Sequence, residues 1–389
     1  MAGWLIRSLA QVCTIKPSKA EARARLSDGD PVSFAPMEDL GIGEKYMHPS
    51  RTRHLGEVVG SYTYFAEGDV LLAKITPCFE NGKLGVARGL TNGVGFGSSE
   101  YIVLRPASTL DAEFLYYYLA RPTFLEEGAR TMTGAVGHKR VAKEFVESYP
   151  IPLPPLSEQR RIVAILDEAF EAIATAKANA EKNLQNAREL FESHLSGICG
   201  PQVSLGQVVN ITTGKLDANA AVEGGEYPFF TCSRDIYAID DYAFDCEALL
   251  LAGNNAVGDF NVKHYEGKFN AYQRTYVITV NAQKRALCRF LYYELLKGLA
   301  RFKSQSVGVG TKFLKIGMIK ELQVALPNMA DQHRLASLTN RIQEEVTTLE
   351  RQFSTKLSTL EELKKSLLHQ AFTGALTTKS TDSQVAEVA

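Results

Sequence analysis

The sequence feature that most constrains the fold is a short proline-containing segment that occurs twice. The first copy spans residues 153–162 (LPPLSEQRRI) and the second spans residues 326–335 (LPNMADQHRL). Proline disfavours helix before it and suits a helix start. An acidic residue, Glu158 or Asp331, falls in the expected first turn, where the helix dipole favours negative charge, and Ser157 is the expected N-cap of the first helix. Two copies of one strand-to-helix boundary predict two similar halves.

A long helix is expected after each copy, and no glycine or proline interrupts the first one. The first helix is expected to run to about Leu195 and the second to about Phe372, where Gly197 and Gly374 end them. Apolar residues recur at spacings that place them on one face of each helix. The expected stripe of the first helix is Ile162, Leu166, Ala169, Ile173, Ala176, Ala180, Ala187 and Leu190. The expected stripe of the second helix is Leu335, Leu338, Ile342, Val346, Leu349, Phe353, Leu360, Leu363 and Leu367.

The two stripes must be buried, most simply against each other. A parallel pair would require residues 201–327 to span the helix length of about 58 Å, whereas a compact domain of that size is only roughly 35–40 Å across. An antiparallel pair needs no such span. The expected fold class is therefore α+β, with two similar α/β domains separated by two long helices that form an antiparallel coiled coil, a dumbbell with approximate two-fold symmetry.

The second globular region repeats the sequence pattern of the first, which is typical of an internal duplication. In order, residues 8–12, 69–73, 114–117 and 136–139 are matched by residues 204–208, 248–252, 290–293 and 309–312. In the first domain, strands are expected at residues 62–65, 70–75, 84–87 and 101–105, and a helix at residues 112–120. The expected organisation is a first domain at 1–152, a helix at 153–199, a second domain at 200–327, a helix at 328–376 and a disordered tail at 377–389.

Composition excludes several function classes. The net charge of −1 argues against a generally basic nucleic-acid binder, although a local basic face remains compatible with it. No apolar run is long enough to span a membrane, and the N-terminus lacks the build of a signal peptide. The six cysteines have no CxxC or zinc-like spacing, so reduced thiols and a cytoplasmic location are expected.

Catalytic motifs are also missing from the sequence. The Asn/Asp-Pro-Pro-aromatic motif of adenine methylases is absent, and residues 308–312 lack the spacing of a P-loop. Asp259 with Glu266-x-Lys268 is a faint trace of a metal-dependent nuclease, but such triplets arise often by chance. The seven histidines show no paired spacing, so no metal site is expected. Sequence motifs therefore give no support to methyl transfer or nucleotide hydrolysis by this chain itself.

Five segments of the sequence carry a resemblance to a known family: residues 152–162, 68–83, 95–101, 252–258 and 372–376. Together they resemble the specificity subunits of type I restriction–modification systems. They lie in the expected order and cover essentially the whole chain. The second helix boundary departs from the family pattern, with Asn328-Met329-Ala330-Asp331 where Pro-Leu-x-Glu is usual.

The resemblance implies a non-catalytic subunit that recognises double-stranded DNA, with each globular part acting as a target-recognition domain for one half of a bipartite, asymmetric site. It implies two modification subunits as partners, which methylate adenine N6 with S-adenosylmethionine, and restriction subunits that form an ATP-driven nuclease. No cofactor is expected in this chain; S-adenosylmethionine, ATP and Mg are expected on the partner subunits. The alternative is a coiled-coil scaffold or antagonist with the same fold that does not recognise DNA.

Candidate DNA-contacting residues are polar and basic side chains on loops, which bond phosphates and base edges. For each of them the alternative role is a solvated surface residue or a turn former. In the first domain they are Lys74, Thr76, Asn81, Lys83, Ser98, Ser99, His138, Lys139 and Arg140. In the second domain they are Arg234, Asn254, Asn255, Lys263, His264, Gln273, Arg274 and Lys312.

The helix starts are the expected docking sites for the modification subunits, by analogy with the family; charged helix faces are otherwise solvated. Four tyrosines, at 116, 117, 292 and 293, are expected to pack in the core or against helices rather than to stack on bases. The docking candidates are Glu158, Gln159, Arg160, Arg161, Asp331, Gln332 and Arg334.

Overall fold

The computed structural model describes residues 4–378 except 136, 284 and 309, and it divides into two compact units. The first unit consists of residues 1–178 and 356–389, and the second of residues 179–355. Each unit contains a globular part together with segments of both long helices. Within the described part of the chain, no helix is long and apolar enough to cross a membrane.

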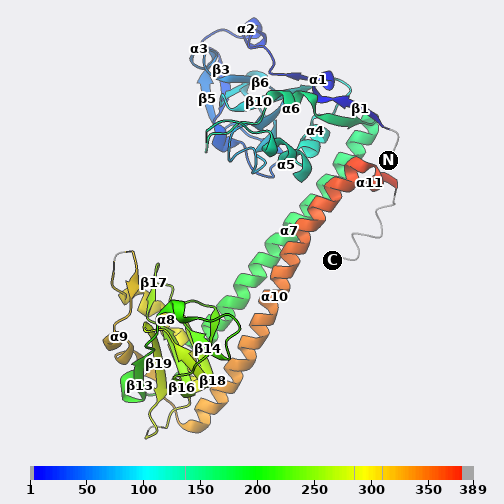
Figure 1. Ribbon diagram of the computed structural model, residues 1–389. Coiled ribbons are helices and arrows are strands. Elements are labelled where there is room, and N and C mark those ends of the chain that lie inside the picture. The colour runs from blue at the N-terminus through cyan, green and yellow to red at the C-terminus, as the bar shows by residue number, and fades with distance from the viewer. Residues whose placement is uncertain (1–3, 136, 284, 309, 379–389) are drawn as a thin grey trace. The chain divides into compact units, whose positions relative to one another are not determined.

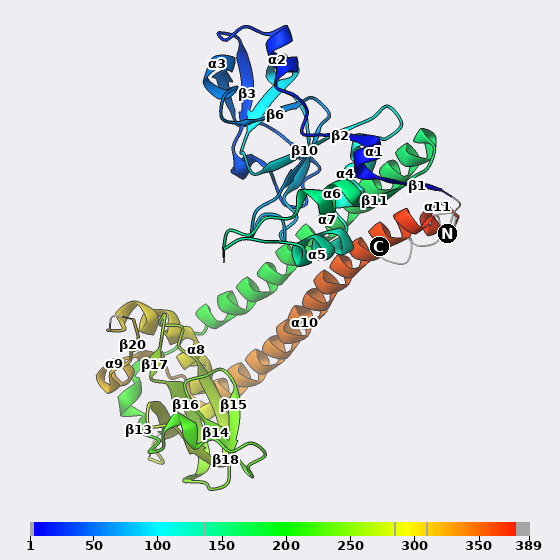
Figure 2. The same ribbon diagram turned by 45° about the horizontal axis from the view of Figure 1, so that its top comes forward.

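The globular part of the first unit combines a five-stranded sheet, a four-stranded sheet and a two-stranded ribbon. Its strands are β1 (Leu5–Ser8), β2 (Cys13–Ile15), β3 (Pro31–Ala35), β4 (Tyr46–Met47), β5 (Arg51–His54), β6 (Thr63–Ala66), β7 (Val70–Ala73), β8 (Leu84–Ala87), β9 (Val94–Gly97), β10 (Tyr101–Pro106) and β11 (Pro150–Leu153). Its short helices are α1 (Leu9–Val12), α2 (Ala20–Arg25), α3 (Leu55–Val58), α4 (Ala112–Leu119), α5 (Pro122–Arg130) and α6 (Lys143–Ser148). The sheet orders are β2-β10-β7-β8-β4 and β5-β3-β9-β6, and β1 pairs with β11. The four-stranded sheet gathers with α2 and α3 in one lobe of this unit (Figure 2).

The central strand β7 is buried on both of its faces. Val70 and Leu72 belong to the apolar cluster that contains Leu115 of α4, whereas Leu71 belongs to a different cluster that contains Phe65 of β6. Successive side chains of a strand point to opposite faces, so a strand covered on both sides needs a continuous apolar run. This explains the sequence Val-Leu-Leu-Ala at this position.

The second unit has the same central arrangement around a six-stranded sheet (Figure 1). Its strands are β12 (Gln202–Ser204), β13 (Val209–Thr213), β14 (Tyr227–Phe230), β15 (Ile236–Ile239), β16 (Phe244–Ala252), β17 (Asn254–Asn255), β18 (Val262–Ala271), β19 (Thr275–Val280), β20 (Lys312–Phe313) and β21 (Gln323–Ala325). Its short helices are α8 (Cys288–Gln305) and α9 (Ile316–Lys320). The main sheet has the order β13-β19-β16-β18-β14-β15, while β12 pairs with β21 and β17 with β20.

The duplication predicted from the sequence is confirmed strand by strand. β7 lies between β10 and β8, and β16 lies between β19 and β18, in both cases with antiparallel pairing. Ala73 pairs with Tyr101 at the end of β7, and Ala252 pairs with Thr275 at the end of β16. β7 is two residues shorter than the expected strand, since it ends at Ala73. This register aligns the central strands of the two globular parts residue by residue.

The two long helices run side by side within each unit (Figure 1). In the second unit, Arg188 Nε donates to Glu350 Oε1 at 2.7 Å, and His194 Nε2 lies 2.9 Å from Thr339 Oγ1. From the first contact to the second, the residue number rises in one helix and falls in the other, so the two helices are antiparallel, as expected. The helices are α7 (Leu156–Ser196) and α10 (Met329–Thr373), and the short α11 (Ala375–Thr378) follows the second.

The first unit shows the same antiparallel pairing. Lys177 bonds Glu361, while Ile162 near the start of α7 shares an apolar cluster with Phe372 near the end of α10. Leu376 of α11 belongs to that cluster as well, so α11 covers the first two residues of the segment expected to be disordered. Residues 379–389 of that segment lie outside the described residues.

The expected helix stripes are wrong at three positions. Leu190, Leu338 and Leu349 are 63%, 39% and 38% exposed, respectively. Near the second globular part, the helices instead bury Leu195 and Ala336, which belong to the core cluster of that domain. A spacing rule for two helices in mutual contact fails here because each helix also turns a face toward the globular core.

The start of α7 also differs from expectation. Ser157 lies inside the helix and is not its N-cap, because the helix begins one residue earlier. Pro155 O accepts the backbone N–H of Glu158 at 2.9 Å, as the carbonyl before a helix does. At the second boundary, Asn328 Oδ1 accepts the backbone N–H of Asp331 at 3.0 Å. The departure from the family pattern at this point therefore supplies a side-chain cap.

Candidate functional site

A glycine-rich loop, residues 133–140, lies against the end of β7 in the first unit. Thr133 and Arg140 exchange two backbone hydrogen bonds, of 3.1 and 2.8 Å, which close the loop at its base. The backbone N–H of Thr76 donates to Lys139 O at 2.9 Å, and that of Val141 donates to Lys74 O at 2.9 Å. The first glycine-rich loop is therefore held beside the segment that follows β7.

The second unit holds an equivalent loop, residues 307–313, beside the end of β16. Val307 and Phe313 exchange two backbone hydrogen bonds, of 3.3 and 2.8 Å. The backbone N–H of Leu314 donates to Gly253 O at 2.9 Å, as Val141 does to Lys74 in the first unit. Strand β17 pairs with β20 within this arrangement. The second glycine-rich loop therefore repeats the anchoring of the first.

The two loops share their unusual backbone conformation. Gly134 and Gly308 have φ values of 126° and 121°, and Gly137 and Gly310 have φ values of 82° and 83°. These left-handed conformations favour glycine. A Cβ added to Gly308 would also lie only 2.1 Å from Thr311 O. The matched sequence segments thus form the same loop structure in both units.

A different pair of side chains fastens each loop to the sheet. The backbone N–H of Lys74 donates to Glu100 O, and that of Gly253 donates to Arg274 O, both at 2.9 Å, so Glu100 and Arg274 occupy equivalent positions. Glu100 forms a bidentate ion pair with Arg140 of the first loop. The Arg274 guanidinium instead lies 5.3 Å from the ring centroid of Phe313 in the second loop.

The structure brings most first-domain candidates together at this loop. Lys74 Nζ donates to Ser99 O at 2.9 Å, and Ser98 Oγ accepts the backbone N–H of Glu100. The side chains of His138 and Lys139 are exposed, and among the described residues they have no hydrogen-bond or ion-pair partner. These two side chains are therefore the most available for phosphate or base contacts.

Three other candidates have internal roles. Thr76 Oγ1 donates to Glu80 at 3.4 Å, and Asn81 lies in the turn between β7 and β8, where its N–H donates to Pro77 O at 3.0 Å. Lys83 Nζ donates to Met37 O at 2.9 Å. The sequence could not reveal this last bond, because its partner lies far back in the chain.

In the second unit, a turn at residues 255–259 brings several candidates together. Asn255 Oδ1 accepts the backbone N–H groups of Val257 and Asp259, at 2.9 and 3.1 Å. Asp259 then forms an ion pair of 2.7 Å with Arg234. Arg234 thus neutralises the carboxylate of Asp259, which argues against the metal-dependent nuclease site that the sequence faintly suggested.

A cavity of about 320 Å³ lies beside this turn. Its lining includes Arg234, Asn261 and Lys303, and a Cβ added to Gly258 of the turn would lie 3.5 Å from side-chain atoms of both Lys303 and Lys312. Lys303, in the last turn of α8, was not among the sequence candidates. Its position beside the second loop depends on the packing of α8, which the sequence pattern does not reveal.

The remaining second-domain candidates have specific partners. Lys263 Nζ donates to Ser233 O at 2.5 Å, and burial lowers the pKa of this ammonium. Gln273 donates to Asp217. His264 Nε2 lies 2.7 Å from Glu247 Oε1. The Lys263 ammonium is therefore held by contacts within the domain, and it is less available to DNA than that of Lys312.

The two glutamines of the repeated boundary, which were expected among the docking residues, are buried. Gln159 and Gln332 are both 0% exposed. Gln159 Nε2 donates to Thr109 O and Pro154 O at 2.9 and 2.8 Å, while its Oε1 accepts the N–H of Asp111 at 2.8 Å. All the strong bonds of this amide are made inside the chain.

Gln332 repeats this arrangement in the second unit. Its Nε2 donates to Arg285 O and Pro327 O at 3.1 and 2.8 Å, and its Oε1 accepts the N–H of Leu287 at 2.8 Å. Each glutamine therefore joins the start of a long helix to the segment that precedes α4 or α8. The recurrence of Gln in both boundaries has this structural cause.

The charged candidates at the helix starts lie on the surface. Arg160 and Arg334 have 72% and 67% exposed side chains. Arg161 lies 3.8 Å from Glu158, and Arg334 lies 3.2 Å from Asp331. Such exposed pairs within one helix contribute little to stability, so these side chains can change partners at low cost.

The tyrosines pack as expected. Tyr116, Tyr117 and Tyr293 are buried. Tyr117 OH bonds Asp167 of α7, and Tyr293 OH bonds Asn340 of α10. Tyr117 and Tyr293 thus each tie a globular part to the helix that follows it in the chain.

These features define a class of protein in which an α/β domain, its glycine-rich loop and the following long helix occur twice in one chain. The chain belongs to the type I restriction modification DNA specificity domain family, whose model matches residues 1–185 and 202–359. The resemblance noted in the sequence is thereby confirmed.

Individual relatives support the family assignment. The chain is 37% identical over 201 residues to the EcoEI specificity subunit of Escherichia coli, covering 51% of this chain and 33% of that one. It is 38% identical over 175 residues to the Escherichia coli EcoDI specificity subunit, covering 45% and 38%. The matches thus span about a third of the length of these relatives.

Solved structures share the fold over nearly the whole chain. A structure described as the basis of complex assembly and conformational transition of the type I R-M system has a TM-score of 0.76 at 18% identity, covering 97% of this chain and 99% of that one. The HsdS subunit from Thermoanaerobacter tengcongensis has a TM-score of 0.62 at 18% identity, covering 96% and 98%. The predicted fold class is confirmed by these neighbours.

Proposed function

We propose that this chain is the DNA-specificity subunit of a type I restriction–modification complex and that each globular part recognises one half of a bipartite, asymmetric double-stranded target. The single observation that carries this proposal is the repeated glycine-rich loop. The same anchoring occurs beside β7 and β16, but the exposed and fastening side chains differ between the two loops. A shared frame with different side chains suits two related but unequal half-sites.

The chemistry around the loops supports DNA as the ligand. Lys139 and Lys312 occupy equivalent positions, each followed by the residue that fastens its loop. Lysine and arginine supply the phosphate contacts that dominate affinity, while glycine lets a backbone approach a phosphate closely. Arg234 and Lys303 add positive charge beside the second loop.

Partner subunits follow from the family. We propose that two modification subunits dock near the helix starts, where Arg160, Arg161 and Arg334 are exposed, and that restriction subunits join the complex. S-adenosylmethionine, ATP and Mg would be held by these partners, so the chain contributes recognition and assembly but no catalysis of its own. The proposed complex acts on DNA in the cytoplasm.

The competing hypothesis is a scaffold or antagonist that has the fold but does not recognise DNA. The two hypotheses differ in the salt dependence of binding, because neutralising phosphates releases counterions and gives a steep decrease of affinity with salt. The complex with its modification subunits is titrated with fluorescent duplex DNA at several salt concentrations. A steep slope supports DNA recognition, whereas no binding at low salt by an intact complex would support the scaffold.

A further inference from the structure

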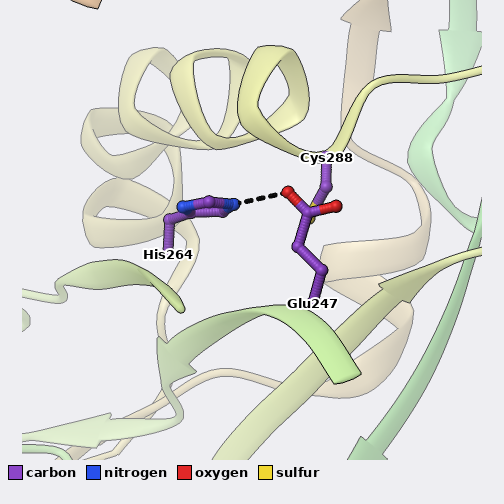
Figure 3. A group of neighbouring side chains, drawn as sticks. All are labelled: Glu247, His264 and Cys288. Carbon is purple, nitrogen blue, oxygen red and sulfur yellow. Dashed lines mark hydrogen bonds and ion pairs between the residues drawn. The ribbon is translucent and has the colours of Figure 1, made fainter. Parts of the chain in front are cut away.

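Three side chains with different metal-ligand chemistry converge beside the N-terminus of α8 in the second unit (Figure 3). They are Glu247 of β16, His264 of β18 and Cys288, the first residue of α8. One ligand atom of each lies within 4.8 Å of the others. The imidazole of His264 points at the carboxylate of Glu247, and the Cys288 side chain approaches that carboxylate from α8 (Figure 3).

We propose that Glu247, His264 and Cys288 form a binding site for one zinc ion. Carboxylate, imidazole and thiolate are the three side-chain ligands that zinc uses, and three protein ligands with one open position form a recognised class of site. Zinc–ligand distances of about 2.0 to 2.3 Å place ligand atoms of a tetrahedral site roughly 3.3 to 3.6 Å apart. Small rotations of exposed Glu247 and of His264 adjust the present spacing to these values.

The register of the sheet places a second acid at the same site. Glu266 lies directly opposite Glu247 on the neighbouring strand, and like charges directly opposite each other destabilise an antiparallel pair. A divalent cation between the strands removes this repulsion. Glu266 is therefore a candidate fourth ligand from the neighbouring strand, with water as the alternative at the open position.

The shared fold does not require these three residues. His264 lies opposite Leu249 just as Val86 lies opposite Val70 in the first unit. By the same alignment, the first unit has Gly68 in place of Glu247 and Ala112, the first residue of α4, in place of Cys288. None of these first-unit residues can ligate through its side chain. The triad is thus a feature of the second domain alone, beyond what the fold needs.

The ion would join three elements that the sequence separates. β16, β18 and α8 each supply one ligand, and Leu287, which precedes Cys288, donates its N–H to buried Gln332 at the start of α10. Zinc binds the thiolate form of cysteine, so zinc binding releases the Cys288 thiol proton to the buffer. The expected result is a more stable second domain.

The test uses the purified full chain, stripped with a chelator and titrated with Zn²⁺ by calorimetry. One equivalent is expected to bind and to raise Tm, and X-ray absorption of that zinc should show a single sulfur ligand at about 2.3 Å. Co²⁺ in place of zinc should give thiolate-to-metal charge-transfer absorption. These readouts need no variant, so they do not depend on the folding of a mutant.

Cys288→Ser and His264→Ala are each expected to abolish binding of the zinc ion. Cys246→Ser is the matched control, because this thiol belongs to the same strand as Glu247 but points to the opposite face, and it should bind zinc normally. Zinc bound with only nitrogen and oxygen ligands, or a full equivalent retained by folded Cys288→Ser, would overturn the proposal. The result is independent of DNA recognition by the chain.

Discussion

Glu100 accepts two hydrogen bonds from the guanidinium of Arg140, from Nε at 2.9 Å and from Nη2 at 2.8 Å. The hydrogen bond with Arg140 lowers the pKa of Glu100 below its usual range, so the carboxylate stays ionised well into the acidic range. At the equivalent place in the second unit, Arg274 stacks on Phe313. The acidic residue Glu100 thus lies beside the first loop, whereas the basic residue Arg274 lies at the equivalent position beside the second loop.

The first prediction concerns this acid. Glu100→Gln removes a negative charge beside Lys139 and Arg140, so the affinity of the complex for non-cognate duplex DNA should rise by roughly two- to fivefold, with a salt slope steeper by about one. Stability should change by less than about 1 kcal/mol, because the pair is near the surface. Fluorescence anisotropy measures the affinity.

Glu147→Gln is the control for that experiment, since it breaks the Lys143–Glu147 ion pair on α6 without adding charge at the loop. Its affinity should equal that of the wild-type complex. Equal affinities for Glu100→Gln and wild type would show that the base of the first loop does not lie near phosphate.

A second prediction concerns the equivalent lysines. Lys139→Ala and Lys312→Ala should each weaken DNA binding and reduce the salt slope by about one, since each lysine is expected to neutralise one phosphate. Assembly with the modification subunits should remain normal in gel filtration. Lys143→Ala is the matched surface control, and a loss of affinity in this control as large as in the loop variants would remove the special role of the loops.

A third prediction separates structure from docking at the helix starts. Gln159→Leu or Gln332→Leu leaves buried backbone groups without partners, and each should lower the free energy of unfolding by about 2–4 kcal/mol. Arg160→Ala or Arg334→Ala should change stability by less than about 0.5 kcal/mol but weaken assembly. Urea denaturation and co-purification measure the two effects. Stable glutamine variants would contradict the account of the boundary motif.

A fourth prediction concerns pH. Glu294 is buried, accepts the N–H of Ala325 at 2.7 Å, and has its pKa raised by burial, with Lys297 3.6 Å away. A raised folded-state pKa means that the contribution to stability is present below the unfolded value of about 4.3 and is lost as pH rises through the folded value. Glu294→Gln should therefore exceed wild type in stability at pH 8 and approach it near pH 4.

Urea denaturation at both pH values measures this difference, with Glu321→Gln as the exposed control. A Glu294→Gln protein less stable than wild type at pH 8 would mean that the ionised carboxylate is net favourable in its buried position.

The sequence predicted those features that depend on local pattern or on internal repetition. The helices α7 and α10, their antiparallel pairing and the duplicated loops follow from spacing, glycine positions and chain connectivity. The burial of Gln159 did not follow, because its partner Thr109 lies in another segment, and a glutamine in a first helical turn is ordinarily exposed.

The side-chain contacts could not be predicted from the sequence for the same reason. The exposure of Leu190 and the role of Lys303 depend on which faces the globular parts cover. The convergence of Glu247, His264 and Cys288 arises from strand register and helix placement, which residue spacing along the chain does not encode. Loop candidates were identified by residue type, but their partners required the tertiary structure.

The central claim is that each unit recognises its own half of the target, and mapping of methylated adenines tests it most directly. The chain is co-expressed with its modification subunits, and the methylated motif is sequenced for two variants. Changing His138 and Arg140 to alanine should relax one half of the motif, whereas changing Arg274 and Lys312 to alanine should relax only the other half. If both variants altered the same half, or each altered both halves together, the assignment of one half-site to each unit would be contradicted.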